Sequence, residues 1–341
     1  MMRYTLAALA TLLVAVATSL VGATHAVAQQ PATEGVVHGR LTMGSAGVTL
    51  EGAVEVELII LEGSAATGSV KAPVTNGAYE ARVPASESRT YVPRLRYLGV
   101  DYFGEPVRFT GSTRDVTRDF TVYATTDRAN SLRLLQTIVT VIGIDPQQGQ
   151  LGILREDVLS LAGDRVYTGG PSGVTLRLPV PAGTTEASEE DGNGTLANGV
   201  LSVTTPIRPG AAASIITSTY LVKYDPAVDR YRLRVTVPVP AESVVVRVPR
   251  DYVHNVRPVA PAVKADDEVL QDDDSTVLSV VRTAARIEGG QSLLVDIDGV
   301  AGVMRHHPLT EQPGASIAAG AVLAVVAGTG VLIWRRREAA V

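Results

Sequence analysis

The chain has 341 residues, a formal net charge of −5 and no cysteine. The lack of cysteine excludes disulfide bonds, a lipid-modified cysteine, covalently attached c-type haem and thiol catalysis. The acidic balance gives no basic footprint for nucleic acid, so we expect no nucleic-acid partner.

The first residues have the pattern of a secretory signal peptide. Arg3 supplies a short positive region, the apolar run LAALATLLVAVATSLVGA follows, and Ala26-Val27-Ala28 offers a small-x-small cleavage pattern. We therefore expect residues 1–28 to be removed on export. The alternative is an uncleaved membrane anchor at the N-terminus.

The C-terminal residues predict a single membrane span. Residues 315–334 carry no charge, end in Trp334 and are followed by Arg335, Arg336 and Arg337. About 20 residues at a rise of about 1.5 Å cross a hydrocarbon core of roughly 30 Å, and basic residues after a span stay cytoplasmic. We expect a stalk at 303–314, a transmembrane helix at 315–334 and a cytoplasmic stub at 335–341. The bulk of the chain would then be extracytoplasmic at the cell membrane.

Small residues recur every four positions within this segment. Their spacing is the small-xxx-small arrangement that lets two helices approach closely, so the segment could pair two copies of the chain. Chance spacing in an Ala-rich helix is the alternative. The residues are Ser316, Gly320, Ala324 and Gly328.

The residues between the two ends have the period of β-strands. In YRLRVTV, Tyr231, Leu233 and Val235 alternate with polar residues, and AVEVELIIL alternates in the same way. Gly, Pro and Asn-Gly turn signals separate such runs. We expect an all-β fold of two tandem β-sandwich domains, Ig-like or prealbumin-like, plus the transmembrane helix. The domains would span 34–126 and 132–302, and a split of the second near residues 257–274 stays open.

The first domain carries features of one known family. These are Val37-x-Gly39 in the first strand, a V-x-L strand at Val56–Leu58, and the stretch NGAYEARVP, in which Asn76-Gly77 would form a type I′ turn. The domain resembles a carboxypeptidase regulatory-like (prealbumin-like) β-sandwich, although Ala81 stands where the family often has an aromatic residue. The resemblance implies a structural or binding accessory domain, and no catalytic residue follows from it.

Aromatic residues gather in one part of this domain. Tyr97, Tyr102, Phe103 and Phe109 lie close together in a chain with 4% aromatic residues. If exposed, Tyr97, Tyr102 and Phe103 would form a binding surface for carbohydrate or a partner protein. The alternative is that they fill the core of the sandwich.

Two segments contain metal-ligand types. Met304, His306 and His307 in the stalk offer sulfur and nitrogen donors for copper or zinc, and the alternative is a polar stalk without a metal. The acidic stretch from Asp266 to Asp274 offers oxygen ligands for Ca²⁺, but it lacks the EF-hand spacing and a solvated linker explains it more simply.

We find no H-E-x-x-H, G-x-S-x-G or P-loop pattern. The sequence therefore predicts no catalytic residue, no cofactor and no enzyme. It predicts a non-enzymatic binding or scaffolding protein of the cell envelope, whose partner is another envelope protein or polymer. One alternative is a metal- or haem-handling accessory protein that uses the Met304/His306/His307 cluster. Another is a hydrolase whose site the sequence does not reveal.

Overall fold

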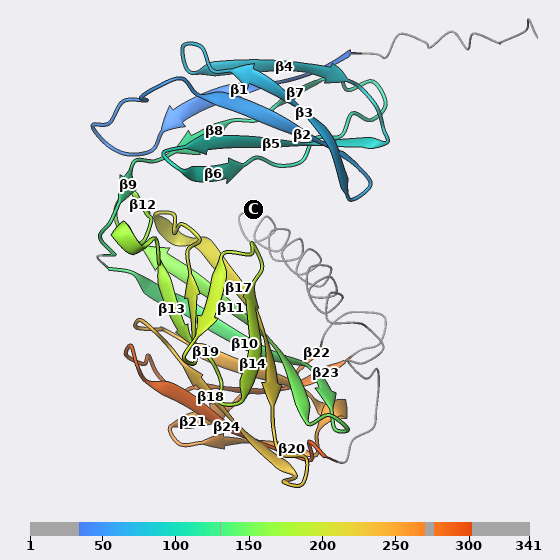
Figure 1. Cartoon of the computed structure of the whole chain (residues 1–341), viewed down its shortest axis with the longest axis vertical. Helices are drawn as coiled ribbons and strands as arrows, with labels where there is room; N and C mark the ends of the chain where they lie inside the picture. Colours follow the sequence, from blue (N-terminus) through green and yellow to red (C-terminus); the bar gives the residue numbers. More distant parts are fainter. Residues whose placement is uncertain (1–33, 130, 270–275, 302–341) are drawn as a thin grey trace, which may run out of the picture. The chain divides into compact units, whose positions relative to one another are not determined.

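The computed structural model describes residues 34–129, 131–269 and 276–301 (Figure 1). Within these ranges the chain forms 24 β-strands and two short 3₁₀ turns, η1 (Gly170–Ser172) and η2 (Arg250–Tyr252). The chain divides into two compact units. The first holds residues up to 42, 52–97 and 101–120, and the second holds 43–51, 98–100 and the described chain from 121 onward. The domain limits at 126 and 132 stay predictions.

The first eight strands form two four-stranded sheets, the layers of a β-sandwich. One sheet has the order β4–β1–β7, with β8 also paired to β1, and the other has the order β3–β2–β5–β6. Every second residue of β4 is buried, which is the pattern of a strand with one face on a core. The strands are β1 (Glu34–Met43), β2 (Glu55–Glu62), β3 (Ala65–Pro73), β4 (Ala78–Pro84), β5 (Arg89–Tyr97), β6 (Val100–Phe103), β7 (Asp115–Thr117) and β8 (Phe120–Val122).

The turn before β4 has the geometry that its sequence predicts. Asn76 and Gly77 have φ angles of 53° and 72°, and the backbones of Thr75 and Ala78 exchange hydrogen bonds of 2.8 and 3.0 Å. A type I′ turn requires positive φ at both central residues. The predicted turn at Asn76-Gly77 is confirmed.

Glycines on the inward face of β1 make room for groups from other strands. A Cβ on Gly35 would lie 2.6 Å from the ring of Phe109, and one on Gly39 would lie 1.9 Å from the carbonyl oxygen of Arg118. Phe109 also packs edge-on against Tyr91, with ring centroids 5.7 Å apart. The two glycines are therefore required by close approach, since any side chain would displace these groups.

The second unit is built on an eight-stranded sheet. Its order is β14–β17–β11–β10–β19–β23–β21, with β22 also paired to β23. β10 and β19 run parallel, whereas the other neighbouring strands are antiparallel. The strands are β10 (Arg133–Asp145), β11 (Gln150–Leu161), β14 (Thr184–Glu189), β17 (Gly210–Lys223), β19 (Val244–Pro249), β21 (Ala262–Lys264), β22 (Glu268–Val269) and β23 (Val277–Thr283).

Two three-stranded sheets, β18–β24–β20 and β13–β16–β15, and the parallel pair β9–β12 complete the unit. One hydrophobic core joins the large sheet to both three-stranded sheets, with Leu151 and Ile153 from β11, Leu178 from β13 and Leu233 from β18 fully buried in it. The remaining strands are β9 (Thr125–Thr126), β12 (Val166–Tyr167), β13 (Leu176–Pro179), β15 (Gly194–Ala197), β16 (Val200–Val203), β18 (Arg230–Thr236), β20 (Asn255–Val259) and β24 (Ser292–Asp298).

A buried ion pair lies within this layered arrangement. Arg155 is 2% exposed and Asp157 is 0% exposed, and both stand on the inward face of β11. Arg155 Nε and Nη2 donate to the Asp157 carboxylate at 2.8 and 3.1 Å, and Thr137 Oγ1 donates to it at 2.6 Å. Burial lowers the pKa of Arg155, but the charges of Asp157 and Tyr220 outweigh burial and the pKa is raised.

The predicted fold class needs correction. The chain is all-β, but within the described residues no helix is long and apolar enough to cross a membrane. Residues 315–334, where the helix was expected, lie outside the described ranges, as do the signal peptide, the stalk and the stub. The second unit also departs from a simple sandwich of eight strands, because two small sheets cover one large mixed sheet. The Pro- and Asp-rich stretch at 257–274 contributes β21, β22 and most of β20.

Candidate functional site

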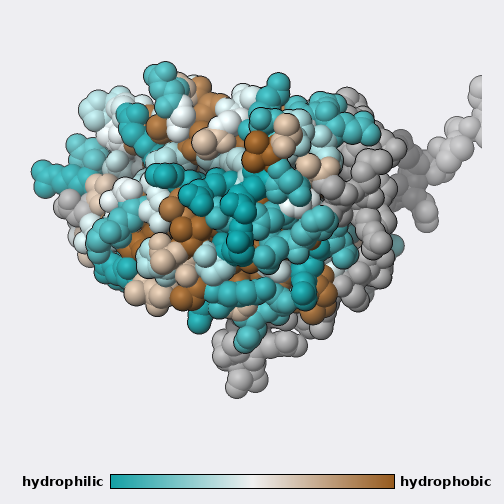
Figure 2. Space-filling view, turned by 90° about the horizontal axis from the view of Figure 1, so that it is seen from below, coloured by the Kyte–Doolittle hydropathy of each residue, from teal (hydrophilic) through white to brown (hydrophobic). Residues whose placement is uncertain are grey.

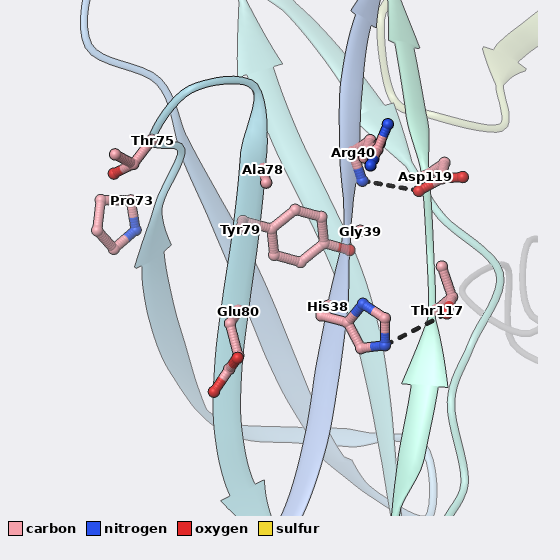
Figure 3. A pocket seen from close by; sticks show the side chains of 10 residues that line it. All are labelled: His38, Gly39, Arg40, Pro73, Thr75, Ala78, Tyr79, Glu80, Thr117 and Asp119. Carbon is pink, nitrogen blue, oxygen red and sulfur yellow. Dashed lines mark hydrogen bonds between the residues drawn. The ribbon is translucent and has the colours of Figure 1, made fainter.

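A groove of about 520 Å³ lies on the first unit where β1, β4 and β7 meet the turn before β4 (Figure 3). Its walls carry one guanidinium, two carboxylates, one imidazole and three hydroxyl groups beside apolar residues. The lining residues are His38, Gly39, Arg40, Pro73, Thr75, Ala78, Tyr79, Glu80, Thr117 and Asp119.

The groove lies beside an interruption in the β-ladder. β7 runs parallel to β1, with Val36 to His38 opposite Asp115 to Thr117. Before β8 begins, the amide of Arg118 donates to the carbonyl of His38 at 2.7 Å, and the amide of Arg40 donates to Asp119 Oδ1 at 2.7 Å. A carboxylate thus replaces a backbone carbonyl in the ladder, which satisfies the amide where the strands separate.

His38 presents its imidazole at the wall of the groove. Its Nε2 lies 2.7 Å from Asp115 Oδ1 and 3.3 Å from Thr117 Oγ1, and the side chain is 40% exposed. A relay that activates a hydroxyl needs one ring nitrogen for the hydroxyl and the other for the carboxylate. Here both groups approach the same nitrogen, so the arrangement orients the ring as a polar contact.

Tyr79 holds the two sides of the groove together. Its ring lies beneath Gly39 in Figure 3, and its hydroxyl donates to the carbonyl of Arg118 at 2.6 Å. Burial, aided by the charge of Asp119, raises the pKa of Tyr79 to about 12. The hydroxyl therefore keeps its proton at neutral pH and remains a donor.

The two charged side chains at the rim differ in how far they are already engaged. Arg40 is exposed, and its guanidinium forms no ion pair with a carboxylate of the described residues. Glu80 accepts from Arg82 Nε at 3.0 Å and is also exposed. Together with the hydroxyls of Thr75 and Thr117, these groups offer donors and acceptors of both charges, which suits recognition of a polar chain.

The predicted aromatic surface is mostly buried. Tyr97 and Tyr102 are 4% and 3% exposed, whereas Phe103 is 57% exposed. Phe109 is also buried, against Tyr91. Tyr97 and Tyr102 therefore belong to the core, and Phe103 alone of the three predicted residues is open to a partner.

The other predicted site residues lie largely outside the described ranges. These are Met304, His306 and His307 for a metal, and Ser316, Gly320, Ala324 and Gly328 for helix pairing. Part of the acidic stretch is described: Asp267 pairs with Arg250 Nη1 at 3.0 Å, and Glu268 pairs with Arg247 Nε at 2.8 Å. These two carboxylates already have cationic partners within the chain.

Sequence reasoning missed most of the groove. It singled out the Val37-x-Gly39 pattern and the Asn76-Gly77 turn, which flank the groove, but not Arg40, Thr117 or Asp119. The sequence shows a glycine at position 39 but not why it is needed there. The carbonyl of Arg118, which leaves no room for a side chain at position 39, is 79 residues away in the sequence.

No family model and no curated protein matches the chain. Among solved structures, an M1 zinc metallopeptidase from Deinococcus radiodurans is 9% identical, with 49% of this chain and 42% of that chain covered and a TM-score of 0.29. The full-length major pilin SpaD from Corynebacterium diphtheriae is 11% identical, with 59% and 61% covered and a TM-score of 0.21. This chain thus spans less than half of that peptidase and less than two thirds of that pilin. Similarities of this size carry no inference about the activity of this chain.

Proposed function

We propose that the protein is a non-enzymatic binding or scaffolding protein, exported and held at the outer side of the cell membrane by its C-terminal segment. Its partner would be another envelope protein or an envelope polymer. Export and attachment rest on the sequence of residues 1–28 and of the C-terminal segment. Binding rests on the groove of the first unit.

The observation that carries the binding proposal is the convergence of a few polar side chains on a groove whose surface is otherwise largely apolar. The rim of the groove exposes Arg40, Glu80 and Thr75. Its floor is formed by Gly39 and Tyr79. A concave site with a few convergent polar groups is the usual form of a specific binding site. Because Asp115 and Thr117 both approach Nε2 of His38, this histidine is better placed to contact a ligand than to activate a nucleophile.

We further propose that the first unit is a carboxypeptidase regulatory-like (prealbumin-like) domain. Its two four-stranded sheets and the Asn76-Gly77 turn support this assignment. Such a domain would act as an accessory that presents the groove. An experimental structure of the full-length protein with another strand order in this unit would exclude it.

Site-specific photo-cross-linking in intact cells tests the function. A benzophenone amino acid at Thr75 places the reactive group at the rim of the groove, whereas the same group at Thr67, which is exposed on β3, serves as the matched control. We expect one discrete adduct from position 75 and none from position 67. Mass spectrometry of the adduct then identifies the partner.

The groove is tested further with Arg40→Gln in the chain that carries the cross-linker at position 75. Loss of the guanidinium should weaken partner binding, and with it the adduct at sub-saturating partner, at least about tenfold if the partner occupies the groove, because a hydrogen bond to a charged group contributes about 1.5–3 kcal/mol. No adduct from position 75, or the same adducts from both positions, would contradict the proposal.

A further inference from the structure

A row of arginines covers the outer face of the sheet β18–β24–β20. Arg230, Arg232 and Arg234 alternate on β18 with buried residues. The register places Arg230 beside Asp298, Arg232 beside Asp296, and Arg234 beside Leu294 of β24. On the other side of β24, Arg257 of β20 stands opposite Asp296. Figure 2 views the end of the second unit where Figure 1 draws β20 and β24, and its surface is predominantly hydrophilic.

Two carboxylates hold three of these arginines in place. Arg230 Nε lies 2.6 Å from Asp298, Arg257 Nη2 lies 2.9 Å from the same carboxylate, and Arg232 binds Asp296 through Nε and Nη2 at 2.7 and 3.0 Å. The hydrogen bond from Arg232 lowers the pKa of Asp296, so this carboxylate stays ionised at neutral pH.

Charge is not balanced on this face. The three strands carry four arginines and two aspartates, an excess of two positive charges in a chain whose net charge is −5. Arg234 is exposed and has no ion pair with any described residue, and its cross-strand neighbour on β24 is the apolar Leu294. Its guanidinium is therefore open to an external carboxylate.

We propose that this face binds an extended peptide segment with acidic residues at alternate positions. Alternate side chains of a strand lie about 6.8 Å apart, and an extended partner has the same spacing. β24 gives the internal example: Asp296 and Asp298, two residues apart, meet Arg232 and Arg230 one to one. A segment lying along β18 would reach Arg230, Arg232 and Arg234 in the same way.

Three of the four arginines, all except Arg234, are also ordered before a partner arrives. Asp298 accepts from two guanidinium groups and Asp296 binds a third in bidentate fashion. Ordering a free arginine side chain costs up to about 2 kcal/mol, so preorganised side chains lose less entropy on binding. This proposal concerns the second unit and does not depend on the groove of the first, so either can fail alone.

The test uses synthetic peptides and the purified full-length protein in detergent. The probe is a labelled (Glu-Thr)5 peptide, and its controls are an isomer with the five glutamates in one block and a (Gln-Thr)5 peptide. Fluorescence anisotropy should show that the alternating peptide binds about tenfold more tightly than the block isomer, a difference of about 1.4 kcal/mol. The (Gln-Thr)5 peptide should not bind.

Two substitutions locate the binding. Arg234→Gln should weaken binding about fivefold while circular dichroism stays unchanged, because Arg234 makes no ion pair with the described residues. The affinity of Arg234→Lys should lie between those of the wild type and of Arg234→Gln, since lysine keeps the positive charge but lacks the planar guanidinium. Arg177→Gln, which removes an exposed arginine of β13, should leave the affinity unchanged.

Three outcomes would overturn the proposal. Equal affinity for the alternating and block peptides would show only general attraction of anions. Binding of phosphatidylglycerol vesicles that saturates the face and displaces the peptide would identify a lipid surface instead. Equal effects of Arg234→Gln and Arg177→Gln would place the binding elsewhere.

Discussion

Replacing Arg155 with methionine should strongly destabilise the second unit. The substitution removes both hydrogen bonds to Asp157 and leaves a carboxylate that is 0% exposed with only the Thr137 hydroxyl as a described donor. Removing one partner of a buried ion pair costs about 3–5 kcal/mol. With a urea m-value of about 2 kcal/mol/M for a unit of this size, the unfolding midpoint should fall by about 2 M.

The double variant Arg155→Met/Asp157→Leu separates the ion pair from its surroundings. It removes both charges, so the isolated buried carboxylate disappears, and the remaining loss is about 1–3 kcal/mol for the hydroxyl left without an acceptor. We expect the double variant to be more stable than Arg155→Met alone, with a coupling free energy of at least about 2 kcal/mol. Urea unfolding, followed by the near-ultraviolet circular dichroism of the tyrosines, measures the four proteins of the cycle: the wild type, Arg155→Met, Asp157→Leu and the double variant.

The reasoning would be refuted if Arg155→Met lowered the stability by less than about 1 kcal/mol, or if the two single effects added. Either result would mean that water or a rearranged side chain replaces the missing partner. If Arg155→Met does not fold, Asp157→Asn tests the same ion pair from the other side, because it keeps the shape and Thr137 as a donor while removing the charge, and we expect it to destabilise the unit as well.

Three further predictions concern other positions. Gly39→Ala should destabilise the first unit by about 1–3 kcal/mol in thermal unfolding, because its Cβ would lie 1.9 Å from the carbonyl oxygen of Arg118. Gly68→Ala is the control: no atom lies within 4 Å of the added Cβ, so the stability should change by about 0.5 kcal/mol or less. Ser45→Ala should cost about 1–3 kcal/mol in urea unfolding, because Ser45 Oγ accepts from the buried amide of Ala124 at 2.9 Å and donates to the carbonyl of Asp164 at 2.5 Å; an unchanged midpoint would be inconsistent with a satisfied buried amide. Burial raises the pKa of Glu156, and the charge of Glu190 adds to this effect. The protonated side chain therefore contributes its full stabilisation below the unfolded pKa of about 4.3, and this contribution is lost as the pH rises through the higher pKa of the folded state. Glu156→Gln should therefore raise the melting temperature at pH 8 more than at pH 4.5, and a gain independent of pH would count against this linkage.

The sequence predicted strands where one face is apolar and the other polar. The runs at β2 and β18 alternate in this way, and each forms a strand. β3 was not predicted, because its sequence AATGSVKAP has small residues on both faces and the strand is exposed over most of its length. Such an edge strand is held by backbone hydrogen bonds to β2, which leave no mark in hydropathy.

The buried charges were hidden for a related reason. In LREDV the period of two places Arg155 and Asp157 on the same face as Ile153 and Leu159. Charges normally indicate the solvent face, so the alternation looked interrupted there. Two opposite charges two residues apart on an apolar face can satisfy each other, and that pattern could have suggested the pair.

The groove could be predicted least, because long-range contacts create it. Asp119 reaches the amide of Arg40 across 79 residues, and Thr117 reaches His38 across the same separation. Local propensity carries no information about such a meeting. The turn at Asn76-Gly77 was visible because its two residues determine their own backbone conformation.

The position of β1 has a consequence for how the protein matures. The first strand of the described chain lies inside its sheet, between β4 and the pair β7 and β8. Its parallel neighbour begins at Asp115, so β1 stays unpaired on that side until the chain beyond this residue has been synthesised. The first unit therefore cannot complete this sheet while only its first strands have been made, and one edge of β1 keeps unsatisfied backbone groups during that interval.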